Sequence, residues 1–297
     1  MPYTKTAKIY RQHFMDDIDN IIGLYKQGTL MKELCKMYNV DIRFVSKIFI
    51  ELGLKKQGVG KYVYSKEDYF DDINSQNKAY ILGLLFADGC NHIYNSNGEG
   101  KYQITLSLQE DDKEILEKIK IEMDLQNPLH YLIPRTGNYI NGKIVKSAKP
   151  QWKLEFNNKH ISLRLNELGM VQNKSLVLQF PDINSILYKH FIRGYFDGDG
   201  SIYSYIADGY LCYRFKITSS YDFCLKVKEV IQKELNINLY LRKENTYNGK
   251  TYTLTSISNR DTKTILSWLY EDADLYMKRK YNKYISFFYS INNSLLA

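Results

Sequence analysis

The stretch "FIRGYFDGDGSI", residues 191–202, decides the fold of this chain. An apolar run typical of a buried helix ends there on an acid, Asp199, followed by Gly200. A carboxylate at a helix C-terminus faces the negative end of the helix dipole, which is unfavourable without a compensating charge. A second stretch, "AYILGLLFADGC" at residues 79–90, ends on the same Asp-Gly pair with Asp88. The sequence therefore predicts two similar helices, each with an acid that needs a partner.

The two stretches open two copies of one pattern. With Gly89 placed over Gly200, an offset of 111 residues, apolar residues coincide through two alternating segments at 102–109 and 213–220. Alternation of this kind predicts strands with one buried face. The pattern is helix, two strands, helix, two strands, helix, read twice, and the longer loop at 134–150 accounts for a smaller offset near the end of each copy. The other predicted strands and helices are 129–135, 151–156, 238–244 and 251–257 for strands, and 111–125, 160–170, 221–235 and 261–271 for helices.

A different unit precedes the duplication. Apolar periodicity predicts three short helices at 16–28, 29–39 and 41–53, the order of a helix-turn-helix domain. Residues 1–60 hold ten Lys or Arg against six Asp or Glu, which favours DNA over a neutral partner. Other trihelical units bind protein or only pack, and those alternatives stay open here. On the third helix, the expected DNA-facing residues are Arg43, Ser46 and Lys47, opposite Val45, Ile48, Phe49 and Leu52.

The expected organisation is therefore α+β, with a small all-α domain ahead of a duplicated αββαββα fold. The predicted boundaries are a helix-turn-helix domain at 1–60, a linker at 61–74, a first repeat at 75–188 and a second at 189–297.

Small residues recur four apart in the first helix of each copy, as Gly83 with Ala87 and as Gly194 with Gly198. Residues four apart share a helix face, so small ones let another backbone approach closely. We expect the two helices to pack together about a pseudo-twofold axis, which brings Asp88 and Asp199 side by side. Two neighbouring carboxylates repel unless a cation lies between them, and Mg²⁺ suits one or two carboxylates with waters and phosphate oxygens.

The nonamers "ILGLLFADG" (81–89) and "IRGYFDGDG" (192–200) resemble the two signature helices of a single-chain LAGLIDADG homing endonuclease. The resemblance covers residues 75–297. It implies a saddle of two antiparallel sheets over duplex DNA and cleavage of both strands with Mg²⁺, for which Mn²⁺ would substitute. Two departures are Phe86, where the family pattern has Asp, and Arg193, where it has a small residue.

The resemblance also implies site residues. Its catalytic, metal-binding acids fall on Asp88 and Asp199, and its metal-ligating backbone carbonyls fall on Ala87 and Gly198. A basic residue late in each repeat organises the attacking water, and "QNKSLVLQFP" and "YMKRKYNKY" place it at Lys174 and Lys280.

The polar face of the central strands is either solvated surface or a reader of the DNA major groove, and the basic charge favours the reader. The predicted reading residues are Lys101, Gln103, Thr105, Ser107 and Gln109 in the first repeat, with Arg214, Lys216, Thr218 and Ser220 in the second. Phosphate contacts, which position without specifying sequence, are expected from Lys153, Arg242 and Lys250.

The bulk properties agree with a nucleic-acid partner. The formal net charge is +8, and four cysteines without metal-ligand spacing indicate reduced thiols. The N-terminus lacks an apolar leader and no stretch is long enough to span a bilayer, so we expect a cytoplasmic or other intracellular monomer bound to double-stranded DNA. An RNA-splicing maturase acting on its host intron RNA, and a DNA-binding regulator that does not cut, are the alternatives.

Overall fold

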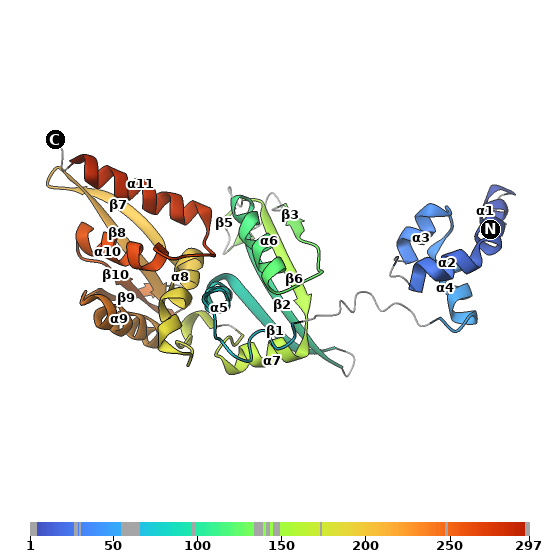
Figure 1. Ribbon diagram of the computed structural model, residues 1–297, viewed down its shortest axis with the longest axis horizontal. Helices are drawn as coiled ribbons and strands as arrows, with labels where there is room; N and C mark the ends of the chain where they lie inside the picture. The colour runs from blue at the N-terminus through green and yellow to red at the C-terminus, as the bar shows by residue number, and fades with distance from the viewer. Residues whose placement is uncertain are drawn as a thin grey trace. The chain divides into compact units, whose positions relative to one another are not determined.

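The computed structural model describes residues 5–26, 29, 31–54, 66–96, 99–133, 139–140, 143–144, 149–172, 174–246 and 249–294. The chain divides into two compact units, Met1–Val63 and Tyr64–Ala297, which are described separately (Figure 1). Within the described part of the chain, no helix combines the length and the apolar character needed to cross a membrane.

The N-terminal unit contains one helix more than the sequence predicted. Its helices are α1 (Lys5–Asp16), α2 (Ile18–Lys26), α3 (Met31–Met37) and α4 (Ile42–Glu51). The additional helix is α1, which contributes Phe14 to a core shared with Ile21, Leu34, Val45 and Phe49. A small unit buries too little surface with three short helices, and the fourth helix closes its core.

Helix α4 follows its sequence signals at both ends. Asp41 caps its start by accepting a hydrogen bond from the Arg43 backbone N–H at 2.8 Å, and Gly53 just past its end has a φ of +65°. One expectation was wrong: Leu52, predicted on the buried side, is 48% exposed. Leu52 is the residue at which the helix ends, so it departs from the 3.6-residue periodicity on which that prediction was based.

The second unit contains the duplicated αββαββα fold that the sequence predicted. Repeat 1 consists of α5 (Gln76–Asp88), β1 (Gly89–Ser96), β2 (Glu99–Gln109), α6 (Lys113–Glu122), β3 (His130–Leu132), β6 (Gln151–Asn157) and α7 (Lys159–Glu167). Repeat 2 consists of α8 (Tyr188–Asp199), β7 (Ser201–Ala207), β8 (Tyr210–Ser219), α9 (Tyr221–Leu235), β9 (Tyr240–Thr246), β10 (Gly249–Thr255) and α10 (Asn259–Tyr270). The two antiparallel sheets have equivalent strand orders, β1-β2-β6-β3 and β7-β8-β10-β9.

Several elements lie outside the duplicated pattern. The loop after β3 contains a small hairpin of β4 (Tyr139–Ile140) with β5 (Lys143–Ile144), and short 3₁₀ turns occur at Glu110–Asp112, Lys174–Leu176 and Ser185–Leu187. A final helix, α11 (Lys278–Ser294), follows α10 and was not predicted. The segment before α5 is core rather than linker: Tyr69, Phe70 and Ile73 are at most 7% exposed, so the packed part of this unit begins before residue 75.

Each sheet is covered on one face and open on the other. In β2 the side chains of Ile104, Leu106 and Leu108 are buried, and in β8 those of Phe215 and Ile217 are buried. The alternate side chains of the same strands stay partly exposed. Because successive residues of a strand point to opposite faces, each repeat has an apolar face under its helices and a polar face available to a partner.

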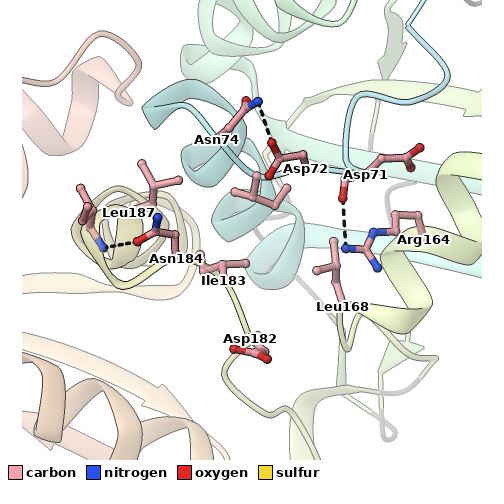
Figure 2. A pocket seen from close by; sticks show the side chains of 11 residues that line it. Asp71, Asp72, Asn74, Arg164, Leu168, Asp182, Ile183, Asn184 and Leu187 are labelled. Carbon is pink, nitrogen blue, oxygen red and sulfur yellow. Dashed lines mark hydrogen bonds between the residues drawn. The ribbon is translucent and has the colours of Figure 1, made fainter.

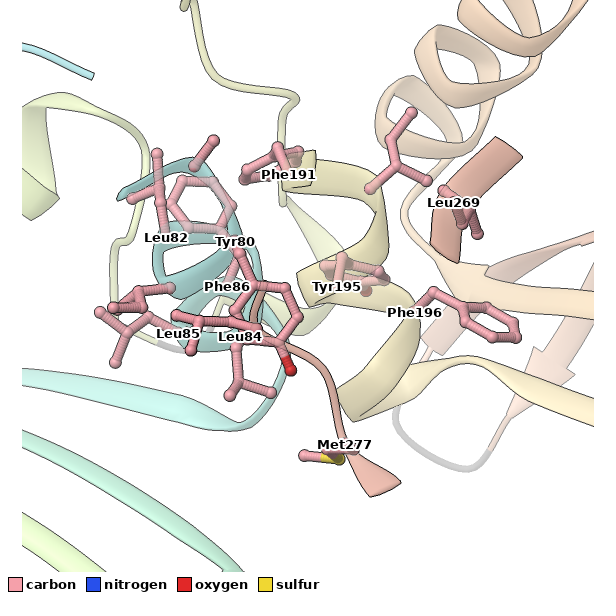
Figure 3. Packing of buried hydrophobic residues seen from close by; sticks show 14 of the residues in the cluster. Tyr80, Leu82, Leu84, Leu85, Phe86, Phe191, Tyr195, Phe196, Leu269 and Met277 are labelled. Carbon is pink, nitrogen blue, oxygen red and sulfur yellow. The ribbon is translucent and has the colours of Figure 1, made fainter. Parts of the chain in front are cut away.

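Helices α5 and α8 form the centre of the unit, and their residues 79–86 and 190–197 are buried throughout (Figure 3). A Cβ added to Gly83 would lie 2.0 Å from the Phe191 carbonyl oxygen, and one added to Gly194 would lie 2.0 Å from the Tyr80 carbonyl oxygen. The two clashes are related by the offset of the repeats. Close packing of α5 on α8 therefore requires glycine at both positions, as the small-residue pattern predicted.

Candidate active site and nucleic-acid interface

Asp88 and Asp199 are the last residues of the two central helices, and both side chains are exposed to solvent. A Cβ added to Gly198 would lie 2.5 Å from the Ala87 Cβ and 2.7 Å from Asp88 Oδ2. The Asp88 carboxylate thus lies beside the backbone that carries Asp199. The paired helices bring the two acids together, as expected from their place in each repeat.

The glycines after the two acids have a steric role. Gly89 and Gly200 are extended, with φ of −79° and −80°, so a left-handed conformation is not the reason for glycine. A Cβ on Gly89 would lie 2.6 Å from the Leu85 carbonyl oxygen, and one on Gly200 would lie 2.1 Å from the Phe196 ring. The chain turns so sharply from helix to strand that only glycine fits, and the turn leaves each aspartate at the surface.

The two carboxylates are harder to ionise than ordinary aspartates. Partial withdrawal from water is the main cause that raises the pKa of Asp88 to about 6, and the charge of Asp199 raises it further against the opposing charges of Lys280 and Lys174. Withdrawal from water also raises the pKa of Asp199, opposed by Lys174, by a hydrogen bond from Tyr195 and by Lys280. Each carboxylate is open to solvent on one side while protein atoms crowd the other, so exposure and a raised pKa coexist.

Lys174 and Lys280 occupy equivalent places in the two repeats. Lys174 Nζ donates to the Gly89 carbonyl oxygen, and Lys280 Nζ donates to the Gly200 carbonyl oxygen. Lys280 also donates to the Phe196 carbonyl oxygen at 3.2 Å. Burial lowers the pKa of both ammonium groups, that of Lys280 to about 8. The structure therefore places one predicted lysine directly beyond each aspartate.

The donors present at this place suit a hard divalent cation. Within the described residues, no cluster of three or more His, Cys, Asp or Glu side chains could hold a metal. The available oxygen donors are the carboxylates of Asp88 and Asp199 and the backbone carbonyls of the last helical turns, including those of Ala87 and Gly198, which lack intrahelical partners. Mg²⁺ binds through one or two carboxylates and keeps several waters, so this sparse oxygen set fits it better than a metal that needs a closed cage.

The open face of the first sheet carries the predicted reading residues. Lys101, Gln103, Thr105, Ser107 and Gln109 all lie on this face of β2 and are partly exposed. Lys153 lies beside Ser107 on β6 and pairs with Glu155, which also accepts a hydrogen bond from Gln103 at 2.8 Å. These side chains form a polar network across two neighbouring strands.

The second sheet places most, but not all, of its predicted residues on the open face. Arg214, Lys216 and Thr218 lie there, and Arg242 on β9 is exposed opposite Thr253. Lys216 lies 3.9 Å from Glu244, and Thr218 lies 3.2 Å from Thr253 through their hydroxyl oxygens.

Two predicted residues of the second repeat lie elsewhere. Ser220 is 4% exposed, caps α9 by accepting a hydrogen bond from the Phe223 backbone N–H, and donates to the Leu178 carbonyl oxygen. A buried capping hydroxyl is not available to DNA. Lys250 shares the strand face of Leu254, which is the covered face, and it is exposed only because it lies near the end of the strand.

Three residues of the N-terminal unit were also predicted to contact DNA. Arg43 and Lys47 are exposed on α4 and Ser46 is partly exposed, opposite the buried Val45, Ile48 and Phe49. Lys47 lies 3.9 Å from Glu51 one helical turn away. The surface is thus available, and its use for DNA remains a prediction.

The comparisons with known proteins match this arrangement. Residues 187–268, most of the second repeat, match the family model of a LAGLIDADG-like domain. This part of the chain is similar to a LAGLIDADG-like domain. The meganuclease I-SmaMI, in a crystal structure bound to uncleavable DNA, has a TM-score of 0.50 and 12% identity, and the match covers 72% of this chain and 90% of that one. The resemblance to single-chain LAGLIDADG homing endonucleases, predicted from the two nonamers, is confirmed at the level of the fold.

Two further relatives are less informative. The LAGLIDADG homing endonuclease I-LtrWI, bound to its target DNA, has a TM-score of 0.47 and 16% identity, with 76% of this chain and 91% of that one covered. The DNA polymerase of Methanocaldococcus jannaschii is 25% identical over an alignment of 228 residues that covers 67% of this chain. That match spans 12% of the polymerase.

The second unit also has open-face residues that the sequence analysis missed. On β1, His92 and Tyr94 lie opposite Gln103 and Lys101, and on β7 Tyr203 lies opposite Arg214. The Tyr205 hydroxyl accepts a hydrogen bond from Arg214 at 2.7 Å. The signal was available: once β2 and β8 are assigned, the preceding segments must supply their hairpin partners, and pairing sets their faces.

One pocket of this unit, among the residues described, lies away from the paired acids. It encloses about 780 Å³ between the segments that lead into α5 and α8, and its lining includes Asp71, Asp72, Asp182 and Arg164 (Figure 2). It is therefore at the N-terminal ends of the helices whose C-terminal ends carry Asp88 and Asp199, about 20 Å away along a 13-residue helix. Three carboxylates against one guanidinium repel phosphate, so this pocket does not suit nucleic acid.

Proposed function

We propose that this protein is a site-specific DNA endonuclease that hydrolyses one phosphodiester bond in each strand of a duplex, with Mg²⁺ as its cofactor. One observation carries the proposal: two aspartates, each followed by a glycine whose carbonyl accepts from a lysine, meet at a pseudo-twofold axis between two polar sheet faces. A duplex also has local twofold symmetry, so paired half-sites suit paired strands.

The residues at the axis supply what phosphodiester hydrolysis needs. Asp88 and Asp199, with the carbonyls of Ala87 and Gly198, would hold the cation. When bound, Mg²⁺ would stabilise the charge that develops on the scissile phosphate and the leaving oxygen, and Mn²⁺ has the same preference for oxygen ligands.

The lysines would act on the attacking water. General acid–base catalysis is most effective when the group's pKa lies near the working pH, and burial brings the pKa of Lys280 to about 8. Lys280 Nζ can therefore hold a water by hydrogen bonding and exchange a proton with it. Lys174 would do the same in the other half-site, since it occupies the equivalent position beside Gly89.

The sheet faces would bind the DNA. Polar side chains of β2 and β8 offer both donors and acceptors, as reading base edges in the major groove requires. Exposed Arg242 and partly exposed Lys153 would contact phosphates and fix the register. Since one chain supplies both half-sites, we propose that it acts as a monomer on a long recognition site, as a homing endonuclease does.

The test is cleavage of a plasmid library with a randomised insert, incubated with purified protein and Mg²⁺, followed by sequencing of linearised products. On the selected site, Asp88→Asn and Asp199→Asn should each abolish linear product while binding in a mobility shift persists. Asp111→Asn and Asp222→Asn are matched controls because both acids are exposed and are related by the same offset of 111 residues. Binding without any cleavage by the wild-type protein would favour a non-cleaving regulator instead.

A further inference from the structure

At two buried positions of the signature helices, α8 carries a charged side chain where α5 carries an apolar one. Arg193 and Asp197 in α8 are both 0% exposed, and their equivalents in α5 are Leu82 and Phe86, at most 1% exposed. A guanidinium and a carboxylate are costly to bury, so their contacts must compensate. Hydrogen bonds of both side chains lead to the same segment of chain.

Arg193 holds one backbone oxygen in the last turn of α10 and one in the connection from α10 to α11. Its Nε donates to the Leu275 carbonyl oxygen at 3.0 Å, and its Nη1 donates to the Leu269 carbonyl oxygen at 3.1 Å. The same Nη1 lies 2.8 Å from His190 Nδ1, and the guanidinium carbon lies 5.3 Å from the centre of the Tyr80 ring. The cation thus fixes the two ends of the segment 269–275.

Asp197 holds the chain two residues further on, at Met277. It accepts from the Met277 backbone N–H at 2.7 Å, from the Tyr80 hydroxyl at 2.8 Å, and from the Tyr270 hydroxyl. Met277 is the residue immediately before α11, and its carbonyl accepts from the backbone N–H groups of Lys280 and Tyr281, each at 3.0 Å. Asp197 therefore fixes the point at which α11 begins.

Lys280 completes a closed path of contacts between α8 and the start of α11, which we call the circuit. It lies in the first turn of α11 and is 5% exposed, and its Nζ reaches back to the carbonyl oxygens of Phe196 and Gly200 in and after α8. The path runs from Asp197 to Met277, through one turn of α11 to Lys280, and back to Phe196 and Gly200, which flank residues 197–199. Figure 3 shows Met277 beside the end of α8. Arg279 anchors the same turn to repeat 1 through Asp112 at 2.9 Å.

Among the described residues, repeat 1 has no such circuit through its signature helix. The side chains of Leu82 and Phe86 carry no polar atom, and the segment before Lys174 is held instead from the sheet. Asn91 donates to the Met170 carbonyl oxygen at 3.4 Å, and Gln172 donates to the Ile93 carbonyl oxygen at 3.2 Å. The two lysines reach equivalent carbonyls by different supports.

We propose that Arg193 and Asp197 are positioning residues for Lys280 and serve the half-site of repeat 2 alone. The inference rests on the proposed function, because it predicts that Arg193 and Asp197 support cleavage of only one of the two DNA strands. Loss of the Asp197 hydrogen bonds should let the start of α11 shift and move the Lys280 ammonium away from its place beside Gly200. The strand cut in the repeat 2 half-site should slow, and the other strand should keep its rate.

The test uses the full chain and two independent readouts. The first is hydrogen exchange of the Met277 amide, and the second is the cleavage rate of each strand of the selected site, labelled separately. Asp197→Leu should remove the protection of that amide and slow one strand by at least about tenfold, since a misplacement near 1 Å can cost about 100-fold. Compared with Asp197→Leu, Asp197→Asn should keep most of the amide protection and most of the cleavage rate, because its side-chain oxygen can still accept from the Met277 N–H. Arg193→Met should slow the same strand.

Phe86→Leu is the matched control, since it loosens the equivalent buried position of α5 without touching the circuit. It should lower the melting temperature and leave the ratio of the two strand rates unchanged. The proposal is overturned if Asp197→Leu leaves the Met277 amide protected, or if it slows both strands equally below the melting temperature. If the wild-type protein cuts neither strand, the proposed function fails, and the exchange experiment still decides whether Asp197 fixes the start of α11.

Discussion

Replacing Gly83 or Gly194 with alanine should separate the two central helices. Each added Cβ would lie 2.0 Å from a backbone carbonyl oxygen of the other helix, whereas ordinary contact begins at 3.4 Å. The helices must therefore move apart by about 1.4 Å, because neither a carbonyl nor a helix backbone can yield alone. The seam between α5 and α8 is buried along its length, so such a shift also disturbs the side chains packed around it.

The expected cost follows from overpacking. Inserting a methyl group into a well-packed core costs about 1–3 kcal/mol, and here the obstacle is backbone, so we expect the upper end. For a unit of this size, that corresponds to a fall in melting temperature of roughly 6–12 °C. The two single variants should fall by similar amounts because their clashes are equivalent. The double variant should fall by less than the sum, since the first substitution already opens the seam for the second.

Differential scanning calorimetry of the wild-type protein and these three variants measures the effects. Gly23→Ala is the control. Gly23 lies within α2 of the N-terminal unit, and apart from the nearby backbone of α2 no described atom lies within 4 Å of an added Cβ. That variant should be neutral or more stable by up to about 1 kcal/mol, the helix-propensity difference. Unchanged melting temperatures in Gly83→Ala and Gly194→Ala would refute close backbone packing of α5 on α8.

The remaining predictions concern charge, the metal and the N-terminal unit. The folded pKa of Asp88, about 6, lies above the ordinary 3.8, so the folded state binds this proton more tightly than the unfolded state. Without metal, the stability contributed by the protonated form is present below about pH 4 and is lost as the pH rises toward 6; Asp88→Asn should flatten that part of a denaturation profile. Mg²⁺ should raise the melting temperature of the wild-type protein at about pH 7, and the rise should disappear in an Asp88→Asn, Asp199→Asn double variant, as calorimetry would show. A chain that begins at residue 62 should still cut at the same bonds but bind with a smaller salt dependence, by about 0.9 in slope for each phosphate that it no longer neutralises, and Arg43→Ala with Lys47→Ala should reproduce most of that decrease in a salt titration. Identical slopes for the full and shortened chains would exclude DNA binding by the N-terminal unit.

The central features of the fold and site were predictable because they repeat. A lone "ILGLLFADG" would indicate a buried helix and no function, but a second copy in register carries the whole order of helices and strands with it. Small residues four apart predicted the seam, and the seam brings Asp88 to Asp199. Lys174 and Lys280 came from a resemblance of short segments, and the structure places each beside the glycine that follows the aspartate of its repeat.

Other features depend on contacts between residues distant in sequence. Arg193 stands in an apolar helix and could be noted only as a departure from the family pattern. Its acceptors are backbone carbonyls at Leu269 and Leu275, and every residue has a carbonyl, so no sequence pattern marks those two. Helix α11 was missed for a related reason: what fixes its start is the contact of Met277 with Asp197, 80 positions away.

Local competition explains the wrong side-chain assignments. Alternation along β8 places Ser220 on the open face, but the strand ends at Ser219 and the Ser220 hydroxyl caps the following helix. Serine readily makes such capping bonds with nearby backbone, so a serine at the end of a predicted strand is as well interpreted as a helix cap. Lys250 was assigned by charge alone, and the register of β10 with β9 places it on the other face.

The two repeats are alike at the axis and different toward the sheet surfaces, and the chemistry accounts for both. Under the proposed function, each half-site cuts the same kind of bond in one strand, so both halves need an acid, a glycine turn and a lysine. On the sheets, repeat 1 presents a network of Gln103, Lys153 and Glu155, whereas repeat 2 presents Arg214 against Tyr205 and paired threonines. Bases that satisfy one pattern of donors and acceptors do not satisfy the other. A protein with these two faces should select a target whose two halves differ in sequence, which two identical subunits could not do.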